Sequence, residues 1–297
     1  MSQQSGYREF AFRGADGAGI AAYAWDAEQP HRAVIQLAHG MGEHARRYAP
    51  AVAPLVAAGY PVYANDHRGH GRTAASPADL GDFGRGGFPA LVDDMLRLTG
   101  IIRRNHAGLP VVLLGHSMGS FAAQLYALDH HDRIDALVLS GSAALDELGA
   151  AAAEAGEQGL EAFNAAFEPA RTPYDWLSRD PAVVDAYIAD PLYNFSVNDA
   201  STLSMFETAG RVADPGQLGE IRSDLPLYVF SGEQDPVGGN LAFVRTLLDR
   251  YRAAGLTRVA HDFYPGGRHE MLNETNRNEV CRNLLAWLRE TVPAPAA

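Results

Sequence analysis

The sequence predicts an α/β fold with a mostly parallel central sheet, helices on its faces and a helical insertion in the second half. Three observations support this prediction. Apolar runs of strand length alternate with helical patterns along the chain. This alternation stops at about residue 143 and resumes after about residue 222. One of the strand runs ends in a Gly-x-Ser-x-Gly turn that leads directly into a helix pattern of small residues.

Length and composition are those of an ordinary globular protein. The 297 residues, 47% hydrophobic and 20% charged, suffice for one large core and an inserted subdomain. A net charge of −12 without any basic run disfavours nucleic acid as a partner. Residues 1–6 do not resemble a signal sequence, and prolines interrupt the longest apolar stretch, near residues 49–64. We therefore expect a cytoplasmic protein without a stable membrane span; the sequence indicates no oligomeric state.

The first half of the chain is expected to form an edge hairpin followed by alternating strands and helices. Residues 7–12 and 19–26 flank an Asp-Gly turn, which predicts two short antiparallel strands. Further strands are expected at 33–38, 61–66, 111–114 and 136–141, with helices over about 46–58 and 88–104 and another after the Gly-x-Ser-x-Gly turn.

The interrupted alternation in the second half divides the chain into two parts. Residues 1–142 and 223–297 are expected to form a core, and residues 143–222 an insertion. The insertion has no run typical of a parallel strand; it is rich in Ala and Pro, with one helix expected around 200–212. Strand and helix patterns then resume, with strands at 227–230 and 258–264 and helices over about 239–254 and 274–291. We expect the insertion to cover the strand ends as a helical cap.

Ser117, at the centre of the Gly-x-Ser-x-Gly turn, is a candidate nucleophile. This spacing lets a serine occupy a strained turn with its Oγ above a parallel sheet. Side chains at Gly115 and Gly119 would collide where strand and helix close on one another. The motif alone is common by chance, so the interpretation depends on the strand and helix around it and on a base and an acid elsewhere.

Two late loops supply an acid and a base. Asp235 follows the apolar strand at 227–230, and His269 follows the last predicted strand in a loop with two glycines. A serine nucleophile needs a base that takes its proton and an acid that orients that base. The order Ser117, Asp235, His269 is the one expected for a triad on this architecture.

Other residues compete for these two roles. Glu233 and Asp224 are alternative acids, but the sequence favours Asp235 at the strand end. His261 lies inside an apparent strand, and His116 is adjacent to the serine, where it cannot readily reach around to act as its base. The sequence therefore favours His269 as the base.

Two histidine-rich loops follow early strands. Gly40 and Gly42 allow the first loop to point backbone amides inward, as an oxyanion hole requires, although a simple turn is the alternative interpretation. The second loop holds Asp66, His67 and His70, a combination that could suggest a metal. Its spacing fits no common zinc signature, so we expect no metal there. A serine nucleophile with its own base and acid needs no cofactor either, so we expect none.

These motifs resemble those of the monoacylglycerol lipase and lysophospholipase branch of the serine α/β-hydrolases, which is also grouped with serine aminopeptidase-like hydrolases. The resemblance covers nearly the whole chain. It is carried by His39-Gly40-Met41-Gly42-Glu43-His44 with Arg47-Tyr48, by Asp66-His67-Arg68-Gly69-His70-Gly71, by Gly115-His116-Ser117-Met118-Gly119 and by the Asp235 and His269 loops.

The resemblance implies the α/β-hydrolase fold and the hydrolysis of acyl esters of small alcohols, such as monoacylglycerols or lysophospholipids, through an acyl-enzyme. It also implies an oxyanion hole made by the backbone amides of Met41 and Met118. Met41 replaces the small residue often found after His-Gly, which could narrow the pocket. The residues that the resemblance places at the substrate are Gly40, Glu43, Arg47, His116 and Tyr187, the last in a Tyr-x-x-Asp-Pro-Leu segment.

The sequence leaves two questions open. The acidic excess lies mostly in the insertion, where residues 143–200 hold eleven acidic and two basic side chains. This charge is either a solvated surface or a means of rejecting anionic substrates. Hydrolysis of a peptide or thioester, perhydrolysis, and a non-catalytic binding protein on the same fold are the alternative functions.

Overall fold

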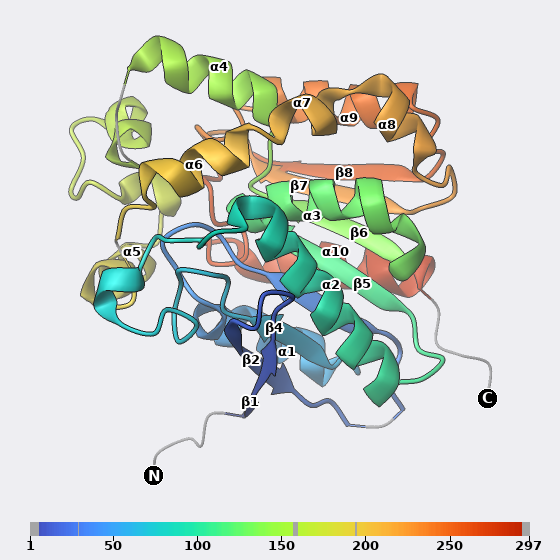
Figure 1. Cartoon of the computed structure of the whole chain (residues 1–297). Helices are drawn as coiled ribbons and strands as arrows, with labels where there is room; N and C mark the ends of the chain where they lie inside the picture. The colour runs from blue at the N-terminus through green and yellow to red at the C-terminus, as the bar shows by residue number, and fades with distance from the viewer. Residues whose placement is uncertain (1–5, 29, 157–159, 194, 293–297) are drawn as a thin grey trace.

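The computed structural model describes residues 6–28, 30–156, 160–193 and 195–292. In this part of the chain a single twisted sheet runs through the molecule between two layers of helices (Figure 1). Its strands are β1 (Arg8–Arg13), β2 (Gly19–Trp25), β3 (Val34–Ala38), β4 (Val62–Asn65), β5 (Val111–His116), β6 (Ala136–Ser140), β7 (Leu227–Gly232) and β8 (Val259–Tyr264).

The sheet is antiparallel at one edge and parallel elsewhere. Its strand order is β1-β2-β4-β3-β5-β6-β7-β8, with β1 and β2 paired antiparallel to their neighbours and all later pairs parallel. In the middle of the sheet, Gln36 of β3 lies in register between Tyr63 of β4 and Leu113 of β5. Because β3 to β8 run in the same direction, the loops that follow them meet at one edge, where ligands bind in such sheets.

Helices cover both faces of the sheet. The α-helices are α1 (Ala49–Ala57), α2 (Gly87–Asn105), α3 (Met118–His130), α4 (Leu145–Ala155), α5 (Pro181–Ala189), α6 (Asp199–Phe206), α7 (Ala209–Ala213), α8 (Pro215–Glu220), α9 (Ala242–Ala253) and α10 (Arg277–Thr291). Short 3-10 helices are η1 (Ala45–Tyr48), η2 (Pro77–Asp79), η3 (His131–Arg133), η4 (Leu160–Phe167) and η5 (Asp175–Leu177). The apolar sides of α1 and α10 share one core, and those of α2, α3 and α9 share the other.

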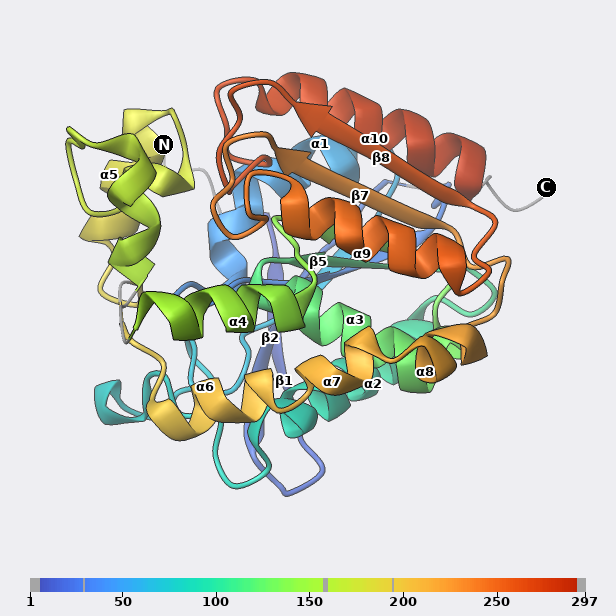
Figure 2. The ribbon, with the colours of Figure 1, turned by 90° about the horizontal axis from the view of Figure 1, so that it is seen from above.

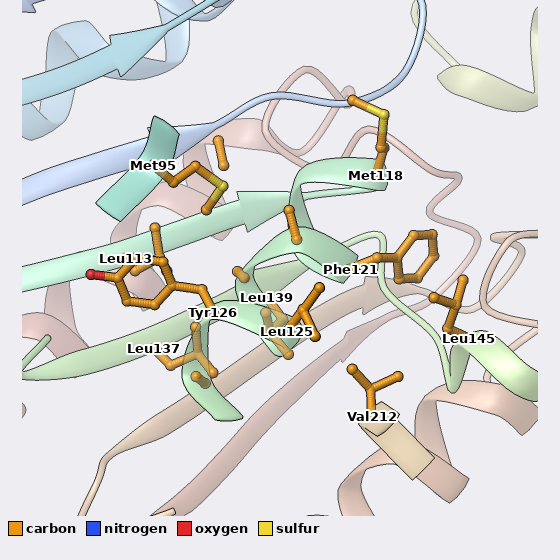
Figure 3. Close-up of a cluster of buried hydrophobic side chains, with 14 of the residues drawn as sticks. Met95, Leu113, Met118, Phe121, Leu125, Tyr126, Leu137, Leu139, Leu145 and Val212 are labelled. Carbon is orange, nitrogen blue, oxygen red and sulfur yellow. The ribbon is translucent and has the colours of Figure 1, made fainter. Parts of the chain in front are cut away.

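The apolar residues that predicted a helix over about 88–104 are the buried ones in α2. In α2, Leu91, Met95, Leu98 and Ile102 recur at helical spacing and are all fully buried. Figure 3 shows the core that they join, in which Phe121 of α3 lies close to Leu145 of α4. The α/β architecture and the positions of its strands are as predicted, within a few residues at each end.

The chain between β6 and β7 is entirely helical or irregular where it is described. Its helices α7 and α8 pack alongside α3 and α9, while the part that carries η5 and α5 lies at the loop edge of the sheet (Figure 2). The prediction of one helix around 200–212 is wrong, because α6 ends at Phe206 and α7 begins at Ala209. The break is stabilised by Thr208, whose hydroxyl donates to the Met205 carbonyl at 2.7 Å.

No helix within the described residues is both long and apolar enough to cross a membrane.

Candidate active site

Ser117 is the single residue between β5 and α3, and its backbone is strained. Its φ of 53° and ψ of −124° lie in a region that side chains other than glycine rarely adopt. The turn is held because the Ser117 amide donates to the Ser140 carbonyl at the end of the neighbouring strand, at 2.9 Å. This conformation places Ser117 at the edge of the sheet, partly accessible, with buried residues on both sides.

The two glycines of the motif have the steric role expected of them. A Cβ on Gly115 would lie 2.7 Å from the Cα of Ser120, and a Cβ on Gly119 would lie 2.5 Å from the carbonyl oxygen of His39. Real Cβ atoms do not approach so closely. Glycine at both positions therefore lets α3 close against β5 and against the loop that follows β3.

His269 and Asp235 form a buried pair. The Nδ1 of His269 lies 2.9 Å from Oδ1 of Asp235, and the two side chains are 2% and 0% exposed. Burial lowers the pKa of His269, but the charge and hydrogen bond of Asp235 outweigh it and raise this pKa above its usual value. The amide of Val237 also donates to Asp235 Oδ1, at 3.0 Å, and fixes the carboxylate.

The competing acids and bases lie elsewhere. Glu233 and Asp224 are exposed, and Asp224 pairs with Arg222 at 2.8 Å. His261 is exposed on β8. None of these three side chains contacts His269 or Ser117 within the described part of the structure.

The imidazole of His269 is packed between two other rings. Its centroid lies 4.8 Å from that of His116 and 4.9 Å from that of Trp176. Burial, followed by the nearby His269, lowers the pKa of His116 well below its usual value, so His116 is neutral. Trp176 belongs to the insertion, and nothing local in the sequence links it to a histidine 93 positions later.

Only some backbone amides of the loop after β3 have a hydrogen-bond acceptor within the described residues. The amides of Gly40 and Gly42 donate to Glu43 Oε1 at 2.5 Å and to His70 Nε2 at 3.2 Å. The Met41 amide between them donates to no atom of the described residues. The Met118 amide is the first of α3 and has no acceptor within that helix.

A cluster of neutral histidines supports this loop. The amide of His67 donates to His39 Nε2 at 2.9 Å, which leaves His39 Nδ1 to donate to the Gly40 carbonyl at 2.8 Å. Burial lowers the pKa of both His39 and His70 to about 3. Nowhere in the described ranges do three or more His, Cys, Asp or Glu side chains form a group that could hold a metal ion. The histidines of the second loop are therefore hydrogen-bonding supports of the first.

Three buried charges lie beside these loops. Arg47 Nη2 donates to Glu270 Oε2 at 2.5 Å, and Arg47 Nε lies 3.3 Å from Glu43 Oε2. The side chains of Arg47, Glu43 and Glu270 are only 6%, 4% and 5% exposed. Burial and the charge of Glu270 raise the pKa of Glu43 to about 7, against the opposing effect of Arg47. The guanidinium of Arg47 also lies over the ring of Tyr187, 5.1 Å from its centroid. Sequence reasoning missed Glu270, although its position directly after His269 was a usable signal.

A small cavity brings most of the predicted residues together. Its volume is about 20 Å³, room for about one water molecule. Seven of the ten predicted site residues line it: Gly40, Met41, Glu43, His116, Ser117, Tyr187 and His269. The other three lie directly behind this lining: Asp235 at His269, Arg47 at Glu43, and Met118 next to Ser117 in the chain. Trp176, Leu177 and Glu270 complete the wall.

The known proteins that this chain resembles are hydrolases. The sequence profile of the family described as "Serine aminopeptidase, S33" matches residues 29–276. The monoacylglycerol lipase of Mycolicibacterium smegmatis is 34% identical over 286 residues, which cover 94% of this chain and 96% of that protein. Human monoglyceride lipase is 31% identical over 182 residues, 60% of this chain and 58% of that protein. The thermostable carboxyl esterase of Bacillus coagulans, solved in complex with glycerol, superposes with a TM-score of 0.85 at 29% identity and covers 96% of this chain and 99% of its own.

Proposed function

Because the chain belongs to the serine aminopeptidase S33 family of hydrolases, we propose that it hydrolyses acyl esters of small alcohols, with monoacylglycerols as its main substrate class. The observation that carries this proposal is that His269, paired with the buried Asp235, lines the same cavity as a serine on a strained turn. The monoacylglycerol lipase of M. smegmatis, similar over nearly the whole chain, supports the choice of ester.

In the proposed reaction, Ser117 is the nucleophile, His269 the general base and Asp235 the acid that orients it. His269 takes the Ser117 hydroxyl proton while Oγ attacks the ester carbonyl. The amides of Met41 and Met118 donate to the oxyanion of the tetrahedral intermediate; one such donor is worth about 3 to 4 kcal/mol. His269 then protonates the departing alcohol, and water repeats the sequence to release the fatty acid. This chemistry requires neither a metal nor an organic cofactor.

The polar side of the cavity is proposed to hold the alcohol. Glu43, Tyr187 and neutral His116 are buried groups that can hydrogen-bond to hydroxyls of a glycerol headgroup. Glycerol is the compound bound in the similar carboxyl esterase of B. coagulans, which supports a small polyol as the leaving group.

Residues 143–222 are proposed to form an inserted cap on a core of residues 1–142 and 223–297. The cavity holds only about one water molecule, so it is too small for an acyl ester. Trp176, Leu177 and Tyr187 form its wall on the side of the insertion. We propose that part of the cap moves away from Ser117 when the substrate enters. The cytoplasmic location expected from the sequence stays a prediction.

A substrate panel combined with covalent labelling tests the proposal. The purified protein is given monoacylglycerols of increasing chain length, a lysophosphatidylcholine, an acyl thioester and an aminoacyl anilide. A fluorophosphonate probe identifies the reactive residue by peptide mass spectrometry. We expect labelling at Ser117 and the highest kcat/KM on a monoacylglycerol. Labelling at Ser117 with turnover of only the anilide or the thioester would overturn the choice of bond, and absence of labelling would overturn the nucleophile.

A further inference from the structure

The loop that carries His269 and the loop that carries Met41 are joined by a chain of buried charges. Glu270 directly follows His269, and its carboxylate accepts from Arg47 Nη2 at 2.5 Å. Arg47 in turn lies 3.3 Å from Glu43 Oε2. Glu43 Oε1 accepts the amide of Gly40, the residue before Met41. A continuous path of ion pairs and hydrogen bonds therefore leads from the base to one oxyanion donor.

We infer that Glu270 is a positioning residue, which acts through Arg47 and Glu43 to set the distance between the base His269 and the oxyanion donor Met41. This inference rests on the proposed function. It concerns the relative placement of two loops that come from opposite ends of the sequence, more than 200 positions apart.

The path through Glu270, Arg47 and Glu43 is the link between the two loops. Further contacts fix each of its side chains. Glu43 Oε1 also accepts the hydroxyl of Tyr48 at 2.5 Å, and Glu270 Oε2 also accepts the side-chain amide of Asn273 at 3.1 Å. The backbone amide of Glu270 donates to the Leu177 carbonyl at 2.8 Å, which attaches the base loop to the insertion as well. Side chains that are held at both ends and are almost fully buried have few alternative positions.

The charges of the link leave Arg47 little capacity to bind an anionic substrate. Two carboxylates contact its guanidinium, and the rings of Tyr187 and Tyr193 lie 5.1 and 5.3 Å from its Cζ. Arg47 is therefore better suited to hold the two loops in place than to recognise a phosphate. Each carboxylate has its own part in this arrangement: Glu43 alone would hold Arg47 on the Met41 side and leave the base loop without a side-chain link to the Met41 loop.

The test compares Glu270→Gln with the wild-type protein on two esters of one acyl chain, 1-octanoylglycerol and methyl octanoate. Methyl octanoate has no headgroup hydroxyls, so a residue that only binds the headgroup does not affect it. We expect kcat to fall about tenfold to a hundredfold on both esters, because a displacement of about 1 Å in a catalytic group costs about a hundredfold. The KM for methyl octanoate is expected to stay within about twofold, and Glu270→Asp is expected to recover part of the loss.

Asp94→Asn is the matched control. Asp94 is as buried as Glu270 and pairs with Arg68 at 2.6 Å, outside the cavity lining. It is expected to lower the melting temperature without reducing kcat on either ester. Should Glu270→Gln not fold, Arg47→Gln cuts the same link from the other loop and is measured on the same pair.

Two results would overturn the inference. A loss confined to 1-octanoylglycerol, with a raised KM and normal turnover of methyl octanoate, would assign Glu270 to headgroup binding. An unchanged kcat on both esters would show that the link does not position the base. The proposed function is tested separately by whether the wild-type protein hydrolyses these esters at all.

Discussion

The imidazole Nδ1 of His269 lies 2.9 Å from Oδ1 of Asp235, in a setting where both side chains are almost completely buried. The bond fixes the ring orientation and assigns the Nδ1 proton to the Asp235 side. It leaves Nε2 as the nitrogen available in the cavity that His269 shares with Ser117. The rings of His116 and Trp176 pack against this imidazole and limit its tilting.

The first prediction concerns pH. Asp235 raises the pKa of His269 above the usual 6.5, and the base acts only when neutral. We therefore expect kcat/KM to rise with pH and to reach half its maximum above pH 6.5. In Asp235→Asn burial remains and the charge is lost, so this midpoint is expected to move to lower pH while kcat falls by about 10⁴-fold. Measurement of kcat/KM against pH with a neutral ester checks both effects; an unchanged midpoint in the variant would contradict them.

The second prediction compares two glycines with positive φ. Gly141 has a φ of +54°, and a Cβ there would lie 2.8 Å from His269 Cε1; Gly17 has a φ of +87° and open space around it. Alanine at either position should cost about 1 to 2 kcal/mol of stability because of its backbone conformation. Only Gly141→Ala should also reduce kcat, by tenfold or more, since it displaces the base. Urea unfolding and ester turnover measure the two effects, and full activity in Gly141→Ala would show that the base tolerates the added methyl group.

The third prediction concerns Trp176. Its ring is 3% exposed and contacts both His269 and Phe163, whereas its Nε1 hydrogen is buried with no acceptor among the described residues. Trp176→Ala should therefore cost about 3 to 5 kcal/mol of unfolding free energy. Trp176→Phe keeps an aromatic ring and removes the unpaired donor, so we expect it to be at least 1 kcal/mol more stable than Trp176→Ala. Equal stability of the two variants would mean that this packing contributes little.

The fourth prediction concerns the charge of the substrate. Glu270 lines the cavity, Arg47 is already paired with it and lies beside Glu43, and residues 143–200 are strongly acidic. We expect lauroylglycerol phosphate to be hydrolysed at least tenfold more slowly than lauroylglycerol at low salt, with zwitterionic lauroyl lysophosphatidylcholine as the control for headgroup size. At about 1 M salt, where the screening length is about 3 Å, the difference should narrow. Equal rates at low salt would favour a merely solvated acidic surface.

Much of this molecule could be predicted from the sequence because its signals are local. Alternating apolar runs identified the strands, and the spacing in Gly-x-Ser-x-Gly identified the turn at Ser117. The helix around 200–212 was predicted wrongly because the pattern does not show that the Thr208 hydroxyl caps a turn at Met205. Its two pieces, α6 and α7, share one apolar periodicity.

What the sequence could not show are contacts between distant segments. The amide of His67 reaches His39 Nε2 because β3 and β4 are parallel neighbours, which brings together two loops whose histidines are 28 positions apart. The contacts of Glu270 with Arg47 and of Trp176 with His269 join segments far apart in the sequence, and neither pair has a recognisable spacing. The catalytic roles assigned to the residues around Ser117 stay predictions until they are tested by substitution.

The activity of Ser117→Ala tests the role of Ser117 as the nucleophile. The variant removes one hydroxyl from a partly accessible turn and leaves the His269–Asp235 pair in place. The wild-type protein and the variant are compared on a monoacylglycerol and a short p-nitrophenyl ester, with the melting temperature as the control for folding. We expect a loss of at least about a thousandfold in kcat and no fluorophosphonate labelling of a variant that melts like the wild type. Hydrolysis by the folded variant at the wild-type rate would contradict this role.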